Sequence, residues 1–188
     1  MKAVLIGDSH SQIVFPQLKQ QLGFEVLVEE SRPGWGVKRF LSSGLIDQLP
    51  QSDVVIIALG GNNQNLTDSY RQEVKSFLNA IQKSSQKVIW IGPYYSTESS
   101  VQRRHKWTNE LLLMMLSGST LYIPMMSLSK NFIPRDGVHY SAQDYSRMVE
   151  MISRKVKFFS LLPLPVLLLR SPLSMVIGAA ASVYIASR

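Results

Sequence analysis

Residues 54–59 read Val-Val-Ile-Ile-Ala-Leu, and Gly60, Gly61 and Asn62 follow directly. A continuous apolar run that is rich in β-branched residues is typical of a strand buried on both faces. Strands of this kind belong to parallel sheets whose two faces are covered by helices. Glycine and asparagine are common turn residues, so they mark the end of this strand.

Similar short apolar runs lie on both sides of this strand, and segments with helical spacing separate them. Further strands are expected at residues 3–6, 24–28, 88–91 and 121–123, and helices at residues 12–22, 67–83, 99–116 and 141–157. Ser141 and Asp144 have the spacing of a capping box that opens the last helix. Alternating strands and helices predict an α/β fold with a central parallel sheet.

Three of the expected strands lead into polar, glycine-containing turns, at residues 7–9, 34–36 and 60–62. In open parallel sheets, ligands bind beyond the carboxyl ends of the strands. We therefore expect these turns to converge on one edge of the sheet and to form a site there.

Ser9, Asp136 and His139 are suited to nucleophilic catalysis. Ser9 lies where the first strand passes into the first helix, beside the helix N–H groups, although serine at such a position more often caps the helix. His139 could take a proton from a serine hydroxyl near neutral pH, and Asp136 could fix its tautomer. The alternative is that Asp136 and His139 are ordinary loop residues.

Two other histidines compete for the role of base. His10 follows Ser9 directly, so we expect its side chain to diverge from the serine hydroxyl. His105 lies in the basic stretch 103–106, which we interpret as a solvated helix face.

Acyl transfer also needs hydrogen-bond donors aimed at the developing oxyanion. The side-chain amide of Asn62 and the backbone N–H of Gly34 are suitable donors at two of the turns. The alternative is that residues 60–63 are simply a turn.

In their order and placement, these segments resemble the blocks of the SGNH/GDSL hydrolase family of serine esterases. Residues 7–9 (Gly-Asp-Ser) are similar to its nucleophile block, and Gly34 stands in the position of its oxyanion glycine. Residues 60–63 (Gly-Gly-Asn-Asn) are similar to its Gly-x-Asn-Asp block, and residues 136–139 match its Asp-x-x-His block. The resemblance covers roughly residues 1–157.

The resemblance implies a flavodoxin-like three-layer sandwich and ester hydrolysis without a metal or other cofactor. It assigns Ser9 as nucleophile, His139 as base and then acid, and Asp136 as the residue that orients His139. The N–H groups of Ser9 and Gly34 and the amide of Asn62 would form the oxyanion hole.

The sequence departs from the family pattern at two places. Asn63 stands where the family has aspartate, and Gly36 could replace Gly34 as an oxyanion donor. Family substrates range from lipids and thioesters to acetylated sugars. Short turns without an evident lid insertion favour a short acyl group, such as acetyl, on a carbohydrate.

The composition changes after Lys157, where we place a domain boundary between a hydrolase-like domain (1–157) and an apolar tail (158–188). All 13 acidic residues precede this boundary, and the tail contains only two basic residues. Its apolar pieces are shorter than the roughly 20 residues of a spanning helix. We expect the tail to associate with a membrane, with packing in a homo-oligomer or a disordered tail as alternatives.

Charge and composition restrict the possible partners, chemistry and location of the protein. The net charge of +7 comes from dispersed basic residues without a nucleic-acid-binding motif, so no nucleic-acid partner is expected. The absence of cysteine excludes disulfides and thiolate chemistry. No signal peptide is apparent, so we expect a cytoplasmic or virion-associated protein, with membrane attachment through the tail. An alternative function is a phage structural or ejection component that retains a hydrolase module.

Overall fold

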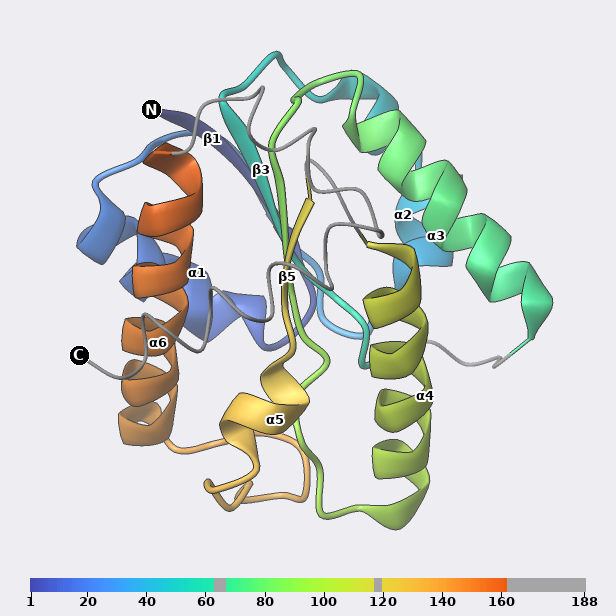
Figure 1. Cartoon of the computed structure of the whole chain (residues 1–188), viewed down its shortest axis with the longest axis vertical. Helices are drawn as coiled ribbons and strands as arrows, with labels where there is room; N and C mark the ends of the chain where they lie inside the picture. The colour runs from blue at the N-terminus through green and yellow to red at the C-terminus, as the bar shows by residue number, and fades with distance from the viewer. Residues whose placement is uncertain (63–66, 117–119, 162–188) are drawn as a thin grey trace, which may run out of the picture.

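The computed structural model describes residues 1–62, 67–116 and 120–161 (Figure 1). Its centre is a five-stranded parallel sheet with the strand order β2-β1-β3-β4-β5. The strands are β1 (Lys2–Gly7), β2 (Glu25–Ser31), β3 (Val54–Ala58), β4 (Val88–Ile91) and β5 (Thr120–Ile123). This order is the flavodoxin-like one, which confirms the predicted α/β fold.

Helices cover both faces of the sheet, as Figure 1 shows. On one face lie α1 (Ser11–Leu22) and α6 (Ala142–Leu161), and on the other lie α2 (Val37–Ser42), α3 (Asp68–Ile81) and α4 (Ser99–Met115). Two further short elements are η1 (Ile46–Gln48) and α5 (Met125–Ser129). The sequence analysis missed α2, η1 and α5, because segments of three to six residues are too short to show a helical period.

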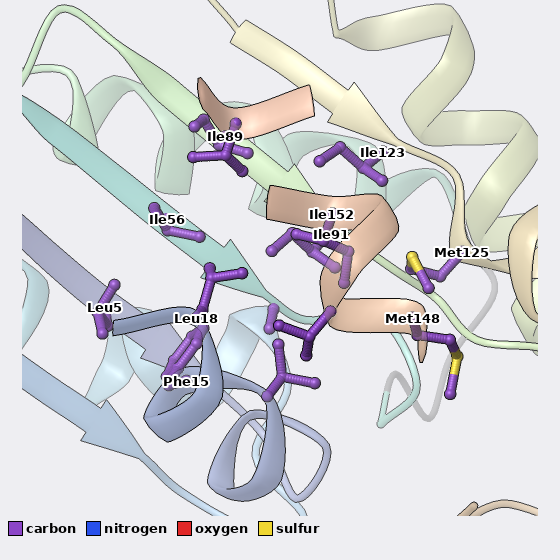
Figure 2. Close-up of a cluster of buried hydrophobic side chains, with 14 of the residues drawn as sticks. Leu5, Phe15, Leu18, Ile56, Ile89, Ile91, Ile123, Met125, Met148 and Ile152 are labelled. Carbon is purple, nitrogen blue, oxygen red and sulfur yellow. The ribbon is translucent and has the colours of Figure 1, made fainter. Parts of the chain in front are cut away.

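Side chains of each strand alternate between two apolar cores. In β3, Val54 and Ile56 face the α1/α6 core, whereas Val55 and Ile57 face the α2/α3/α4 core. Both sets are fully buried, which explains the continuous apolar run in the sequence. Figure 2 shows the α1/α6 core, where strand residues meet side chains of the two helices: Leu5, Ile56, Ile89, Phe15, Leu18, Met148 and Ile152.

The carboxyl end of β1 lies very close to the start of α1. A Cβ atom on Gly7 would come within 2.2 Å of the Ser11 Cβ, so glycine is required at this position. The Ser11 hydroxyl donates to the Asp8 carbonyl at 2.6 Å. Neighbouring strand ends are joined by the Asp8 N–H, which donates to the Ala58 carbonyl, and by the Arg32 N–H, which donates to the Gly7 carbonyl. Ser9 directly follows Asp8 and is thereby held at the edge of the sheet.

Helix α6 begins with the predicted cap and continues beyond its predicted end. The Asp144 N–H donates to Ser141 Oγ at 3.1 Å, and the Ser141 hydroxyl donates to Asp144 Oδ2 at 2.6 Å. The helix extends to Leu161, and Phe159 is 4% exposed within the α1/α6 core. Residues 162–188, most of the expected tail, lie outside the described residues, so the boundary after Lys157 stays a prediction. No helix within the described ranges is long and apolar enough to cross a membrane.

Candidate active site

Ser9, His139 and Asp136 form a continuous series of hydrogen bonds at the carboxyl edge of the sheet. Ser9 Oγ lies 3.0 Å from His139 Nε2, and His139 Nδ1 lies 2.8 Å from Asp136 Oδ2. Ser9 follows β1, whereas the other two residues lie in the loop between α5 and α6. A hydroxyl, an imidazole and a carboxylate in this order form the arrangement that activates a serine nucleophile.

Local hydrogen bonds hold the Asp136 carboxylate in place. Its Oδ1 atom accepts the backbone N–H groups of His139 at 2.6 Å and Val138 at 3.0 Å. The His139 N–H, the His139 side chain and the Val138 N–H hold the pKa of Asp136 well below its usual range. Asp136 is therefore ionised at neutral pH, and its charge can stabilise an imidazolium at His139.

The segment between β4 and α4 also holds the loop that carries Asp136 and His139. The Gly137 carbonyl accepts the Ser96 hydroxyl at 2.6 Å and the Thr97 N–H at 3.0 Å. Gly137 has a φ of 85°, and a Cβ atom there would come within 3.1 Å of Glu98 Cγ. Glycine therefore permits both the turn and the close packing. Ser96 and Thr97 were not predicted from the sequence. The one feature that pointed to them was their place in the segment that follows an expected strand.

Asn62 contacts Asp8, the chain neighbour of Ser9. The Asn62 amide nitrogen is 3.4 Å from Asp8 Oδ2 and 3.4 Å from the Trp35 carbonyl oxygen. These are long hydrogen bonds, so a substrate oxygen can compete for the amide protons. Asn63 lies outside the described residues, and its departure from the family pattern stays untested.

Gly34 occupies an exposed turn at this edge. The Trp35 N–H donates to the Arg32 carbonyl at 3.1 Å, with Pro33 and Gly34 between them. Gly34 has a φ of 74°, as the third residue of a type II turn requires. Gly36 is buried and caps α2. The Trp35 carbonyl lies between the two glycines and accepts from Asn62, so the segment that carries both candidate oxyanion donors contacts the Asn62 turn.

Asp8 is buried between Ser9 and the Asn62 turn. The His10 N–H donates to its Oδ1 atom at 3.0 Å. Burial raises the pKa of Asp8 to about 7, against the opposing effects of the His10 N–H and of His139. The resemblance placed Asp8 in the nucleophile block without giving it a role, and the structure makes it the contact between that block and Asn62.

His10 points away from Ser9 Oγ into a cluster of tyrosines, as expected. Its Nδ1 atom lies 2.7 Å from the Tyr145 hydroxyl, and its ring stacks on Tyr94 at 4.2 Å between centroids. Burial lowers the pKa of His10 to about 3, so the ring is neutral. His139, and not His10, is thus the histidine in contact with the candidate nucleophile.

The interpretation of His105 as a residue on a solvated face is wrong. His105 is 1% exposed, and its Nδ1–H donates to the Tyr94 carbonyl at 2.7 Å. The turn of α4 places His105 on the same inward face as Thr108 and Leu112, while Lys106 stays exposed. The basic neighbours of His105 in the sequence concealed its place on the buried stripe.

The described residues contain no cluster of three or more histidine, aspartate or glutamate side chains that could hold a metal ion. The site consists of a hydroxyl, an imidazole, a carboxylate and nearby amide groups. A three-layer α/β sandwich with these groups at the carboxyl edge of its sheet has the architecture of a serine hydrolase.

Solved structures of other proteins share this architecture. The catalytic domain of a peptidoglycan O-acetyltransferase from Streptococcus pneumoniae matches with a TM-score of 0.63 at 15% identity, over 86% of this chain and 96% of its own. An acetylxylan esterase from Geobacillus stearothermophilus matches with a TM-score of 0.57 at 16% identity, over 87% and 95% of the two chains. A lipolytic protein of the G-D-S-L family from Desulfitobacterium hafniense matches with a TM-score of 0.57 at 19% identity, over 81% and 98%.

No family model and no curated protein matches the sequence. The three solved structures nevertheless show that the chain has the fold of the SGNH/GDSL hydrolases, the family that its sequence blocks resemble.

Proposed function

We propose that this protein is a serine esterase of the SGNH type, which hydrolyses short acyl esters, acetyl foremost, on carbohydrate. The observation that carries the proposal is the 3.0 Å contact between Ser9 Oγ and His139 Nε2, with Asp136 on the far side of the imidazole. The reaction needs neither a metal nor an organic cofactor, because these side chains provide the nucleophile and the base.

In the first half of the reaction, Ser9 Oγ attacks the ester carbonyl carbon while its proton passes to His139 Nε2. The carbonyl oxygen becomes an oxyanion, which the amide of Asn62 and the N–H groups of Ser9 and Gly34 stabilise. Asp136 holds the Nδ1 proton and stabilises the imidazolium. The intermediate then collapses, and the departing alkoxide takes the proton from Nε2.

In the second half, a water molecule attacks the acyl group on Ser9 and gives its proton to His139. The second tetrahedral intermediate collapses, and Ser9 Oγ leaves with the proton from Nε2. The products are a carboxylic acid and the free enzyme. His139 therefore acts as base and acid in turn, which requires its Nε2 atom to face the serine throughout.

The exposure of the site supports a bulky alcohol part in the substrate. The side chains of His139 and Asp136 are 41% and 60% exposed, so the leaving group lies towards solvent. The structural neighbours include an acetylxylan esterase and a peptidoglycan O-acetyltransferase, and both names denote acetyl chemistry on glycans. An acetylated carbohydrate satisfies both observations.

The test is hydrolysis of p-nitrophenyl acetate, p-nitrophenyl butyrate and an acetylated xylo-oligosaccharide by the purified protein. Turnover of acetate above butyrate, with release of acetate from the oligosaccharide, supports the proposal. Ser9→Ala serves as the matched control, because it removes one oxygen from a half-buried side chain. Failure to hydrolyse any of the three esters would favour the alternative of a structural or ejection component with a hydrolase module.

We also propose that the part of the apolar tail beyond α6, residues 162–188, attaches the protein to membranes that contain anionic lipids. The proposal rests on the sequence of the tail, which has no acidic residue and a high apolar content. Exposed basic residues precede it on α6, at Arg154, Lys155 and Lys157, and such residues are attracted to anionic headgroups. A homo-oligomer that buries the tail would be the alternative outcome.

A further inference from the structure

Tyr145 connects segments that adjoin the two reacting residues. Tyr145 lies in the first turn of α6 and is fully buried. Its hydroxyl is 2.7 Å from His10 Nδ1, and its backbone N–H donates to the Ser141 carbonyl at 3.0 Å. His10 directly follows Ser9, and Ser141 lies two residues after His139.

Burial keeps His10 neutral, so its ring carries one N–H and one lone pair, and Nδ1 forms a hydrogen bond with the Tyr145 hydroxyl. The backbone N–H of Tyr145 donates to the Ser141 carbonyl. The contacts therefore form a series that runs from Ser141, just after His139, through Tyr145 to His10, next to Ser9.

The His10 end of this series is rigid. Its backbone N–H donates to Asp8 Oδ1 at 3.0 Å, and one face of its ring stacks on Tyr94 with an angle of 13° between the planes. The centroid of its ring lies 5.2 Å from that of His139. His10 thus lies behind the imidazole of His139, and its neutral state avoids charge repulsion when His139 becomes protonated.

We propose that Tyr145 and His10 are positioning residues that form a brace, defined by the hydrogen bond between the Tyr145 hydroxyl and His10 Nδ1, and that this brace sets the separation of Ser9 Oγ and His139 Nε2. The inference rests on the proposed esterase function. Ser9 and His139 are 130 residues apart in sequence and approach from different elements. A displacement of about 1 Å between reacting groups can cost about 100-fold in rate.

The test compares Tyr145→Phe with Tyr140→Phe. Tyr140 belongs to the same cluster, with its ring centroid 5.7 Å from that of Tyr145, but its hydroxyl donates to the Tyr95 carbonyl and lies 3.2 Å from Ser129 Oγ. Each substitution removes one buried hydroxyl, and Tyr140→Phe leaves the hydrogen bond of the brace intact. Tyr145→Phe should lower kcat by about 10- to 100-fold with an unchanged KM, whereas Tyr140→Phe should change kcat by less than about 3-fold at a similar loss in Tm.

Substitutions of His10 test the other end of the brace. His10→Asn keeps a polar acceptor near the place of Nδ1 and should retain more activity than His10→Leu, which removes it. The double variant His10→Leu/Tyr145→Phe should have a kcat no lower than that of the slower single variant, because both substitutions break the same hydrogen bond. Equal losses for His10→Asn and His10→Leu, or additive losses in the double variant, would overturn the brace.

The NMR signals of the His139 imidazole separate failure of the brace from failure of the esterase proposal. If the wild-type protein hydrolyses no ester, the proposed function is wrong, and the brace is then judged by these signals alone. Tyr145→Phe should shift the His139 ring resonances, and Tyr140→Phe should leave them in place. Equal effects of the two substitutions on kcat and on these resonances would overturn the inference.

Discussion

Asp136→Asn should impair catalysis through the tautomer of His139. In the wild-type site, Asp136 Oδ2 accepts the Nδ1 proton of His139 at 2.8 Å, so Nε2 is free to take the proton of Ser9. An asparagine can keep the Oδ1 contacts to the two backbone N–H groups. Its NH₂ group then faces Nδ1 and favours the tautomer with the proton on Nε2. That tautomer cannot accept the serine proton.

The size of the loss follows from the exposure of the pair. Replacement of a buried aspartate in a catalytic triad costs about 10⁴-fold in kcat. Asp136 is 60% exposed, so water screens its charge and can partly replace its hydrogen bond. We therefore expect a loss of about 10²- to 10³-fold in kcat, smaller than the loss in His139→Ala, with little change in KM.

The assay is steady-state hydrolysis of p-nitrophenyl acetate, with Asp144→Asn as the matched control. Asp144 is a carboxylate of the same region that bonds Ser141 and caps α6, and its neutralisation should leave kcat within about 3-fold. Wild-type activity in Asp136→Asn would refute the assignment of Asp136 as the residue that orients His139. Equal losses of kcat in the two variants would show that the effect comes from a disturbed fold of this segment.

Ser9→Ala and His139→Ala should each reduce kcat by about 10⁴-fold or more, and the double variant should be no slower than either, because the two residues act as a unit; additive losses would argue against His139 as the base. Asp8 holds its proton up to a pH of about 7 in the folded protein, whereas an aspartate in the unfolded chain loses its proton near pH 3.8, so the burial of Asp8 costs stability as the pH rises. Chemical denaturation should therefore show Asp8→Asn gaining on the wild type by about 1.4 kcal/mol per pH unit between about pH 4 and 7, and a constant difference would contradict the buried carboxyl. Truncation after Leu161, where α6 ends, should keep esterase activity and abolish flotation with anionic liposomes, an attraction that should weaken with salt. A truncated protein that aggregates would place the tail in the core instead, and a change from oligomer to monomer would make it an assembly element.

The fold could be predicted from the sequence because its strands are buried on both faces. The run from Val54 to Leu59 has no polar interruption, and the turns that begin at Gly7 and Gly60 carry glycines that the close approach of the chain requires. The short helices α2 and α5 could not be predicted, since one or two turns carry too few apolar residues to define a face.

The candidate catalytic residues were predictable because their chemistry requires particular side chains in a particular order. The hydrogen bonds that hold these residues in place were not predictable, because they join segments that lie far apart in the sequence. Ser96 holds the Gly137 carbonyl across 41 residues, and Tyr145 meets His10 across 135. His105 shows the converse error, because its charged neighbours suggested solvent while the helical period placed it inside.

The central claim is that Ser9 is a nucleophile activated by His139. Treatment of the full chain with methanesulfonyl fluoride, followed by mass spectrometry of its peptides, tests it most directly. We predict one methylsulfonyl group, located on Ser9, with esterase activity lost in proportion to labelling and with no label in Ser9→Ala. Esterase activity that survives complete labelling of Ser9, or inactivation with the label on another residue, would contradict the claim.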